Sequence, residues 1–297
     1  MRAWLQPVPA FFALFGLLFG SFLNVVRIRM PEGMSIVHPG SRCPRCQHPL
    51  AAWQNIPVLS WMLLCGRCSF CHFPISPTYP IVEIATSVLW TMSVVASVRQ
   101  PAPIVQAVAS AIFCWIMLLL AALDWQHFWL PDRITWPTIM LGLLWRGLHA
   151  SIAPLPISPM LAAVLPAMEL EAKPGVIFAA VLAAVLAALA GAAIVLVLRF
   201  TYWLVRRREG MGLGDAKLLA AIGAWLGFTA MLDSFLVAVL GASVAALLWI
   251  PFHLKRRSNQ GWSTMSFPLG VVLAFAAIAE IFSPAWLLHL WLQLAFR

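Results

Sequence analysis

Apolar residues in this chain of 297 residues gather into long, nearly uninterrupted runs that are separated by short polar segments. Eight runs approach about 20 residues, the length at which a helix crosses the hydrocarbon core of a bilayer. They begin near Phe11, Ile81, Val105, Ile134, Val176, Ala216, Phe235 and Phe267. The pattern predicts an all-α polytopic membrane protein with about eight transmembrane helices.

Two segments interrupt this regular pattern. Prolines at positions 154, 156, 159 and 166 break the apolar stretch from Ser151 to Ala167, and this predicts an irregular excursion outside the membrane. A longer polar segment, from Arg27 to Thr78, predicts a soluble insertion between the first two helices. We therefore expect a first transmembrane helix over residues 1–26, an insertion over 27–79 and a multi-helix membrane core over 80–297.

Charge sets the expected orientation. Only 10% of the residues are charged, against about 25% in an average soluble domain. If the N-terminus lies outside, 14 of the 19 lysines and arginines fall on inner segments, as expected for a chain whose cationic loops stay in the cytoplasm. The net charge of +9 then reflects topology, and no basic face interleaved with aromatic residues favours a nucleic-acid partner.

The insertion contains two Cys-x-x-Cys pairs, Cys43 with Cys46 and Cys68 with Cys71, separated by 21 residues. This spacing is typical of a four-cysteine zinc site, and reduced thiols on the cytoplasmic side favour metal over disulfides. The alternatives are four unligated cysteines or two redox pairs. A zinc ion would supply the core that so small an insertion lacks. Cys65 and Cys114 are interpreted as bystanders.

Three aspartates lie at the predicted inner ends of apolar runs, where a carboxylate is costly and is by default a functional candidate. Asp132 follows Pro131 and fits a helix cap. Asp215 lies near a predicted helix start, where the helix dipole favours an anion. Asp124 ends its predicted helix, where the dipole disfavours an anion, so a functional role is the preferred interpretation there.

The predicted topology brings Asp124 and Asp215 to the same depth in the membrane. Two converging carboxylates can share a proton, one acting as base toward a water molecule and the other as acid toward a carbonyl oxygen. That is the chemistry of an aspartic protease. Gly210, Gly212 and Gly214 would let the backbone pass close to a substrate chain, although a flexible loop before a helix explains them as well.

These residues also carry a family resemblance. The stretch "GMGLGDAKLLAAIGAWLG" resembles the Gly-x-Gly-Asp signature of the bacterial type IV prepilin peptidases, and "LDWQHFWLPDRITWP" resembles the motif with their other aspartate. "FGSFLNVVRIRMP", the four-cysteine segment with "WQNIPVLSW" and "YPIVEIATSVLW" match further blocks of the family in the same order. The match extends to about Gly227.

The resemblance implies a bifunctional enzyme of the bacterial inner membrane. It implies that the enzyme removes the basic leader from prepilins or type II secretion pseudopilins and then N-methylates the new N-terminus with S-adenosylmethionine. By motif position, the catalytic pair is Asp124 and Asp215, and the metal ligands are Cys43, Cys46, Cys68 and Cys71. The chain shows no soluble Rossmann pattern, so no residue is assigned to the methyl donor. Glu83 is interpreted as a carboxylate at a helix start.

Two other classes of function stay open on the residues alone. A transporter would need acidic groups near mid-span in broken helices, and a zinc-bearing scaffold would leave the aspartates unexplained. For a peptidase, we expect an apolar substrate helix to pack in the bilayer, with Gly223 and Gly227 allowing its close approach.

Overall fold

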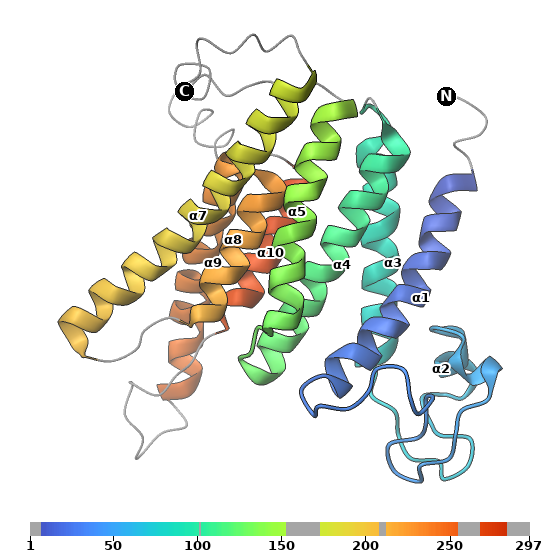
Figure 1. Ribbon diagram of the computed structural model, residues 1–297. Helices are drawn as coiled ribbons and strands as arrows, with labels where there is room; N and C mark the ends of the chain where they lie inside the picture. The colour runs from blue at the N-terminus through green and yellow to red at the C-terminus, as the bar shows by residue number, and fades with distance from the viewer. Residues whose placement is uncertain (1–6, 101, 153–172, 208–211, 255–267, 284–297) are drawn as a thin grey trace, which may run out of the picture. The chain divides into compact units, whose positions relative to one another are not determined.

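The computed structural model describes residues 7–100, 102–152, 173–207, 212–254 and 268–283. Within these ranges the chain forms nine α-helices and one short 3-10 helix (Figure 1). They are α1 (Pro7–Arg29), η2 (Ala52–Asn55), α2 (Leu59–Leu63), α3 (Thr78–Ser97), α4 (Pro103–His127), α5 (Asp132–Ile152), α7 (Lys173–Arg206), α8 (Leu213–Leu226), α9 (Phe228–Leu254) and α10 (Leu269–Phe282).

Each of the eight predicted apolar runs coincides with one helix of at least 14 residues, so the all-helical class is confirmed. Among the described residues, five helices are long and apolar enough to cross a membrane: Pro7–Arg29, Thr78–Ser97, Pro103–His127, Pro174–Arg206 and Phe228–Ala245. α8 and α10 have 14 residues each, or about 21 Å of helix, which is shorter than a bilayer core. The predicted excursion over Ser151–Ala167 lies almost entirely outside the described residues.

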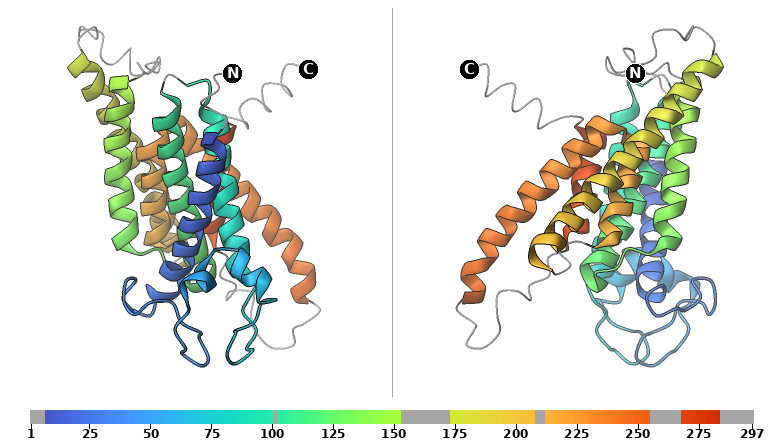
Figure 2. Two further views of the ribbon diagram at one scale, coloured as in Figure 1. Left: turned by 90° about the vertical axis from the view of Figure 1, so that its right-hand side faces the viewer. Right: turned by 60° about the vertical axis from the view of Figure 1, so that its left-hand side comes forward.

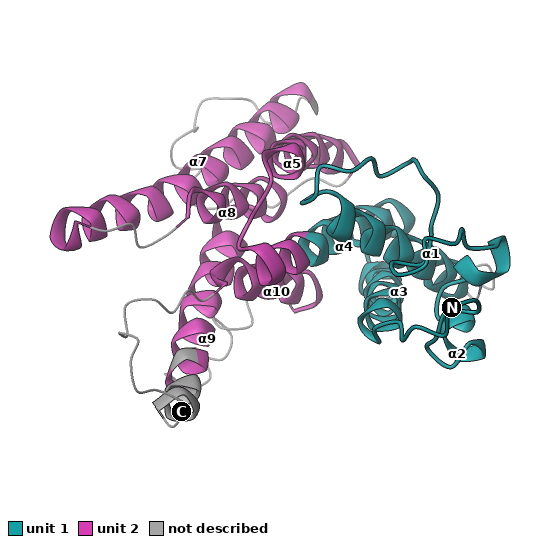
Figure 3. Ribbon diagram, turned by 90° about the horizontal axis from the view of Figure 1, so that it is seen from below, with its two compact units in different colours: residues 1–119 teal, residues 120–297 magenta. Residues whose placement is uncertain are grey.

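The chain divides into two compact units, residues 1–119 and 120–297 (Figure 3). In the first unit, α1 and α3 run side by side (Figure 2). A Cβ atom on Gly16 would lie 2.5 Å from the Cα atom of Ser87, so the two helix backbones approach very closely. Small residues permit this kind of contact between membrane helices. The insertion that carries the four cysteines lies at one end of this helix pair.

In the second unit, α7 and α8 also meet backbone to backbone. A Cβ atom on Gly223 would lie 2.6 Å from the carbonyl oxygen of Ala187, and one on Gly191 would lie 2.8 Å from that of Leu219. α5 covers another side of α8, where the Trp225 ring nitrogen donates a hydrogen bond to the Thr138 carbonyl at 2.8 Å. Almost all residues of α8 from Ala216 to Trp225 are therefore buried.

This packing corrects the expected role of two glycines. Gly223 is buried against α7, so it is not free to receive a substrate helix. Gly227 ends α8 with a φ angle of +88°, a backbone conformation that favours glycine. Both glycines serve the fold of α8 itself, and the expectation that they receive the substrate is wrong.

Candidate functional site

The two Cys-x-x-Cys pairs converge. The ligand atoms of Cys43, Cys46, Cys68 and Cys71 all lie within 4.8 Å of one another, and Cys43 Sγ lies 3.8 Å from Cys71 Sγ. Zinc bound tetrahedrally by four sulfurs at about 2.3 Å requires sulfur separations of about 3.8 Å. The cluster can therefore hold a metal ion of this size and geometry. Cys65 and Cys114 do not belong to it.

Each half of the cluster repeats the same backbone turn. The Cys43 amide donates to the His48 carbonyl, and the Cys68 amide donates to the Phe73 carbonyl, both at 3.0 Å. The residues four positions after these cysteines, Gln47 and His72, both have positive φ angles, 57° and 54°. The sequence already contains this repeat as Arg-Cys-x-x-Cys-x-x-Pro, at 42–49 and at 67–74, a signal that the spacing argument did not use.

The thiols of the cluster do not ionise independently. Backbone amides of Cys71 and Phe70 lower the pKa of the Cys68 thiol to about 6. For Cys46, a backbone hydrogen bond at His48 lowers the pKa, but desolvation and the three other sulfurs outweigh it and raise the pKa to about 11. The Cys68 thiolate thus forms easily, while ionisation of the Cys46 thiol is opposed. A bound cation would stabilise all four thiolates together.

Buried polar contacts join the insertion to its two helices. The Val58 amide, in a backbone with φ of 62°, donates to Glu83 Oε2 at 2.7 Å. Arg27, which is buried, donates to Asn24 Oδ1 at 2.8 Å, and Asn24 in turn donates to the Tyr79 carbonyl. Glu83 is thus more than the helix-start carboxylate expected from its position, because it fixes the base of the insertion.

Asp124 lies in the last turn of α4 and is buried, with 6% of its surface exposed. The Val271 amide, in the first turn of α10, donates to Asp124 Oδ2 at 3.1 Å. The C-terminal end of α4 disfavours an anion, but the N-terminal end of α10 favours one. The structure therefore supplies a hydrogen-bond donor for the buried Asp124 that sequence reasoning missed, because the signal, "FPLG" at 267–270, is remote along the chain.

Asp215 is the third residue of α8, and Gly212 is the N-cap of that helix. A Cβ atom on Gly212 would lie 3.6 Å from Asp215 Oδ2, so the Asp215 side chain turns back toward the N-cap residue of its helix. Leu130 Cδ1 lies within 3.4 Å of the Cβ positions of both Gly214, which precedes Asp215, and Gly270, which contacts Asp124 Oδ2, so the structure brings the two aspartates selected from the sequence into one region. Gly210 lies outside the described residues, and Gly214 packs against Leu130.

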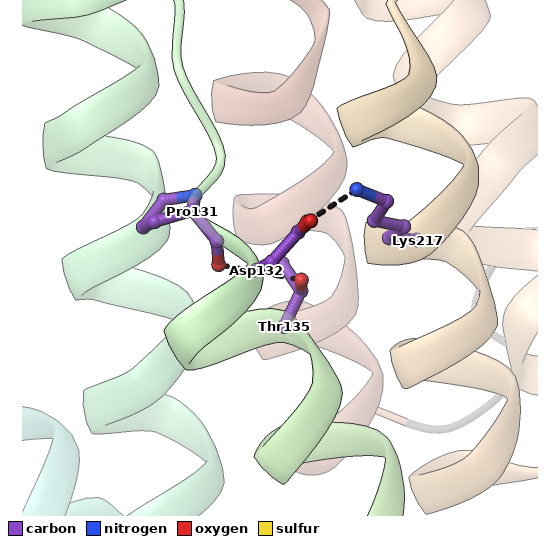
Figure 4. Close-up of polar contacts among 4 residues, drawn as sticks. All are labelled: Pro131, Asp132, Thr135 and Lys217. Atoms are coloured by element: carbon purple, nitrogen blue, oxygen red, sulfur yellow. Dashed lines mark hydrogen bonds and ion pairs between the residues drawn. The ribbon is translucent and has the colours of Figure 1, made fainter.

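Asp132 is the first residue of α5, as expected for a helix start. Its carboxylate pairs with the ammonium group of Lys217, two residues after Asp215 on α8 (Figure 4). The Pro131 carbonyl accepts hydrogen bonds from the backbone amide and the hydroxyl of Thr135. The Asp132 side chain is 61% exposed, and its observed partner is this lysine. The ion pair links the first residue of α5 to the second turn of α8.

Comparisons with known proteins identify the family of this chain. Residues 14–97 match the family model "Bacterial Peptidase A24 N-terminal domain". Two overlapping segments, 111–173 and 159–251, match the model "Type IV leader peptidase family". Together these matches span the four cysteines and both aspartates.

Curated relatives with the name "Prepilin leader peptidase/N-methyltransferase" include proteins from three different genera. The protein from Aeromonas hydrophila is 34% identical over 94% of this chain and 89% of its own length. The protein from Klebsiella pneumoniae is 37% identical over 77% of this chain and 90% of its own length. The protein from Pseudomonas putida is 33% identical over 98% of this chain and 95% of its own length. No solved structure matches the chain. On the family models and on these nearly full-length similarities, this chain belongs to the type IV leader peptidase family.

Proposed function

We propose that this chain is a prepilin leader peptidase and N-methyltransferase. The relatives that carry this name match it over most of both chains. The observation that supports the peptidase assignment is the approach of Asp124 on α4 and Asp215 on α8, whose neighbours Gly270 and Gly214 both pack against Leu130. Neither a scaffold nor a structural metal site requires two acidic groups to converge beside apolar helices.

In the proposed reaction, one of the two carboxylates takes a proton from a water molecule, which attacks the carbonyl carbon of the scissile peptide. The other carboxyl group donates a proton to the carbonyl oxygen. When the resulting intermediate collapses, the C–N bond breaks and the leaving amine takes up a proton. The burial of Asp124 and its bond from Val271 fix the orientation of one partner in this exchange.

The substrates proposed here are type IV prepilins and type II secretion pseudopilins, each with a basic leader followed by an apolar helix. We place the chain in the bacterial inner membrane, with α5, α8 and α10 embedded beside the five long apolar helices. The distribution of lysine and arginine supports a cytoplasmic position for the insertion and for the aspartates. The scissile bond then lies at the cytoplasmic border of the bilayer.

Zinc is the proposed metal, held by Cys43, Cys46, Cys68 and Cys71, because the sulfur separations fit its tetrahedral geometry. Its role is to cross-link the two turns of the insertion. S-adenosylmethionine is the proposed methyl donor for the new N-terminus. The buried polar groups of the first unit, Asn24, Arg27 and Glu83, bond within the chain and so provide no assignment of the donor site.

The test is the incubation of purified protein in detergent with a purified pilin precursor, followed by mass measurement of the product N-terminus. We expect loss of the leader and, with S-adenosylmethionine added, a product heavier by one methyl group. An intact precursor, after incubation with folded protein and with each candidate substrate of the host, would argue against the proposed function.

A further inference from the structure

Gly270 is the second residue of α10, and α10 begins against the carboxylate of Asp124. The Val271 amide donates to Asp124 Oδ2 at 3.1 Å, and Gly270 lies directly against the same carboxylate. Gly270 is itself buried. The contact joins residues that lie 147 positions apart in the sequence, so it depends on the tertiary fold.

A methyl group at Gly270 would fit only if the Asp124 carboxylate moved. A Cβ atom there would lie 2.8 Å from Asp124 Oδ2, 3.1 Å from Asp124 Cγ and 3.4 Å from Leu130 Cδ1. The backbone of Gly270 does not have a positive φ angle, so its conformation does not call for glycine. The close approach of the Asp124 carboxylate is therefore the physical reason for a glycine at this position.

Leu130 extends this arrangement toward the second aspartate. Its side chain is buried, and a Cβ atom on Gly214 would lie 3.0 Å from Leu130 Cβ and 3.1 Å from Leu130 Cδ1. Gly214 directly precedes Asp215. One leucine side chain thus fills the space next to both glycines, each of which adjoins one of the two aspartates.

We propose that Gly270 is a positioning residue for the peptidase reaction. The missing side chain lets the first turn of α10 approach and hold the carboxylate of Asp124 in one orientation. This inference rests on the proposed function, because it takes Asp124 as one of the two catalytic acids. It assigns a role to α10, the only described helix after α9.

The first test compares Gly270→Ala with Gly241→Ala on cleavage of a pilin precursor. Gly241 on α9 is a matched control, because a Cβ atom there meets only the tip of the Val272 side chain, at 3.1 Å. Displacement of a reacting group by about 1 Å can cost about 100-fold in rate. We expect Gly270→Ala to lower kcat by about 10- to 100-fold with KM unchanged, and Gly241→Ala to retain the rates of the unmodified protein. Normal kcat in Gly270→Ala would overturn the proposal.

The second test does not depend on catalysis. Thermal unfolding is measured for Gly270→Ala in the natural chain and in the Asp124→Ala background, where the obstructing carboxylate is absent. We expect a clear fall in Tm in the first case and a much smaller one in the second, because the stability effects of substitutions at contacting residues do not add. Equal falls would refute the contact. If Asp124→Asn cleaves the precursor normally while the two falls in Tm differ, then Asp124 is not a catalytic acid, but the contact between Gly270 and Asp124 is supported.

Discussion

Replacement of Gly223 by alanine tests how far the active site depends on close packing between α7 and α8. The new Cβ atom would lie 2.6 Å from the Ala187 carbonyl oxygen, against about 3.4 Å for ordinary contact, so the helices must separate by about 0.8 Å. The neighbouring atoms belong to the backbone and cannot rotate away. Such overpacking typically lowers the free energy of unfolding by about 1–3 kcal/mol. The higher helix propensity of alanine offsets at most about 1 kcal/mol of this loss.

The same displacement reaches the proposed catalytic group. Asp215 lies on α8 about two turns before Gly223, so a shift of the helix moves its carboxylate relative to Asp124. We expect Gly223→Ala to lower Tm and to slow precursor cleavage by about 10- to 100-fold. Both are measured on purified protein in detergent, by thermal unfolding and by the initial rate of leader removal.

Gly147→Ala is the matched control for this substitution. It lies on α5, where a Cβ atom would meet only side-chain methyl groups, Val181 Cγ2 at 3.2 Å and Ile177 Cγ2 at 3.8 Å. Those groups can adjust, so we expect unchanged or slightly higher stability and normal cleavage. If Gly223→Ala is as stable and as active as Gly147→Ala, then α7 and α8 do not meet backbone to backbone and the reasoning is refuted.

Three further outcomes are expected. Elemental analysis of purified protein finds about one zinc per chain. The double variant Cys43→Ser with Cys46→Ser loses this zinc, and Cys65→Ser keeps it. Metal-free protein of full activity and stability would contradict a structural metal. Lys217→Met changes Tm only slightly, because the Asp132 side of this ion pair is 61% exposed and a pair in contact with solvent contributes about 0–1 kcal/mol. A large loss would mean that the pair with Asp132 is essential to the fold. Moving the scissile bond outward by two helical turns, about 11 Å, stops cleavage, while neutralising the leader only slows it; efficient cutting of the displaced bond would contradict the proposed depth of the site.

The helices of this fold follow closely from local pattern, because each long apolar run has a single regular way to satisfy its backbone in a bilayer. The same reasoning could not give the lengths of α8 and α10. Gly227 interrupts one apolar stretch by taking a left-handed conformation, and the separation of α8 from α9 depends on that residue. The role of Gly223 was likewise hidden, since the sequence does not say which helix covers it.

The sequence identified the residues of the site but not all of their contacts. Four cysteines in two short pairs have few ways to combine, so the sequence identified a cluster that the structure closes. Asp124 and Asp215 stood out because acidic residues are rare in apolar segments. The environment of Asp124 could not be inferred, because its partners in α10 lie far along the chain and no local signal pairs one helix end with another. The same limit applies to the ion pair of Asp132 and Lys217.

The central claim, that Asp124 and Asp215 together perform peptide cleavage, is tested most directly by single substitutions assayed on one pilin precursor. The initial rate of leader removal is measured for Asp124→Asn, Asp215→Asn and Asp132→Asn, each after a check of folding by thermal unfolding. Because an amide can neither take nor give the proton in this reaction, the account predicts no detectable cleavage by the first two variants and most of the activity in the third. Normal cleavage by folded Asp124→Asn or Asp215→Asn, or its loss only in Asp132→Asn, would contradict it.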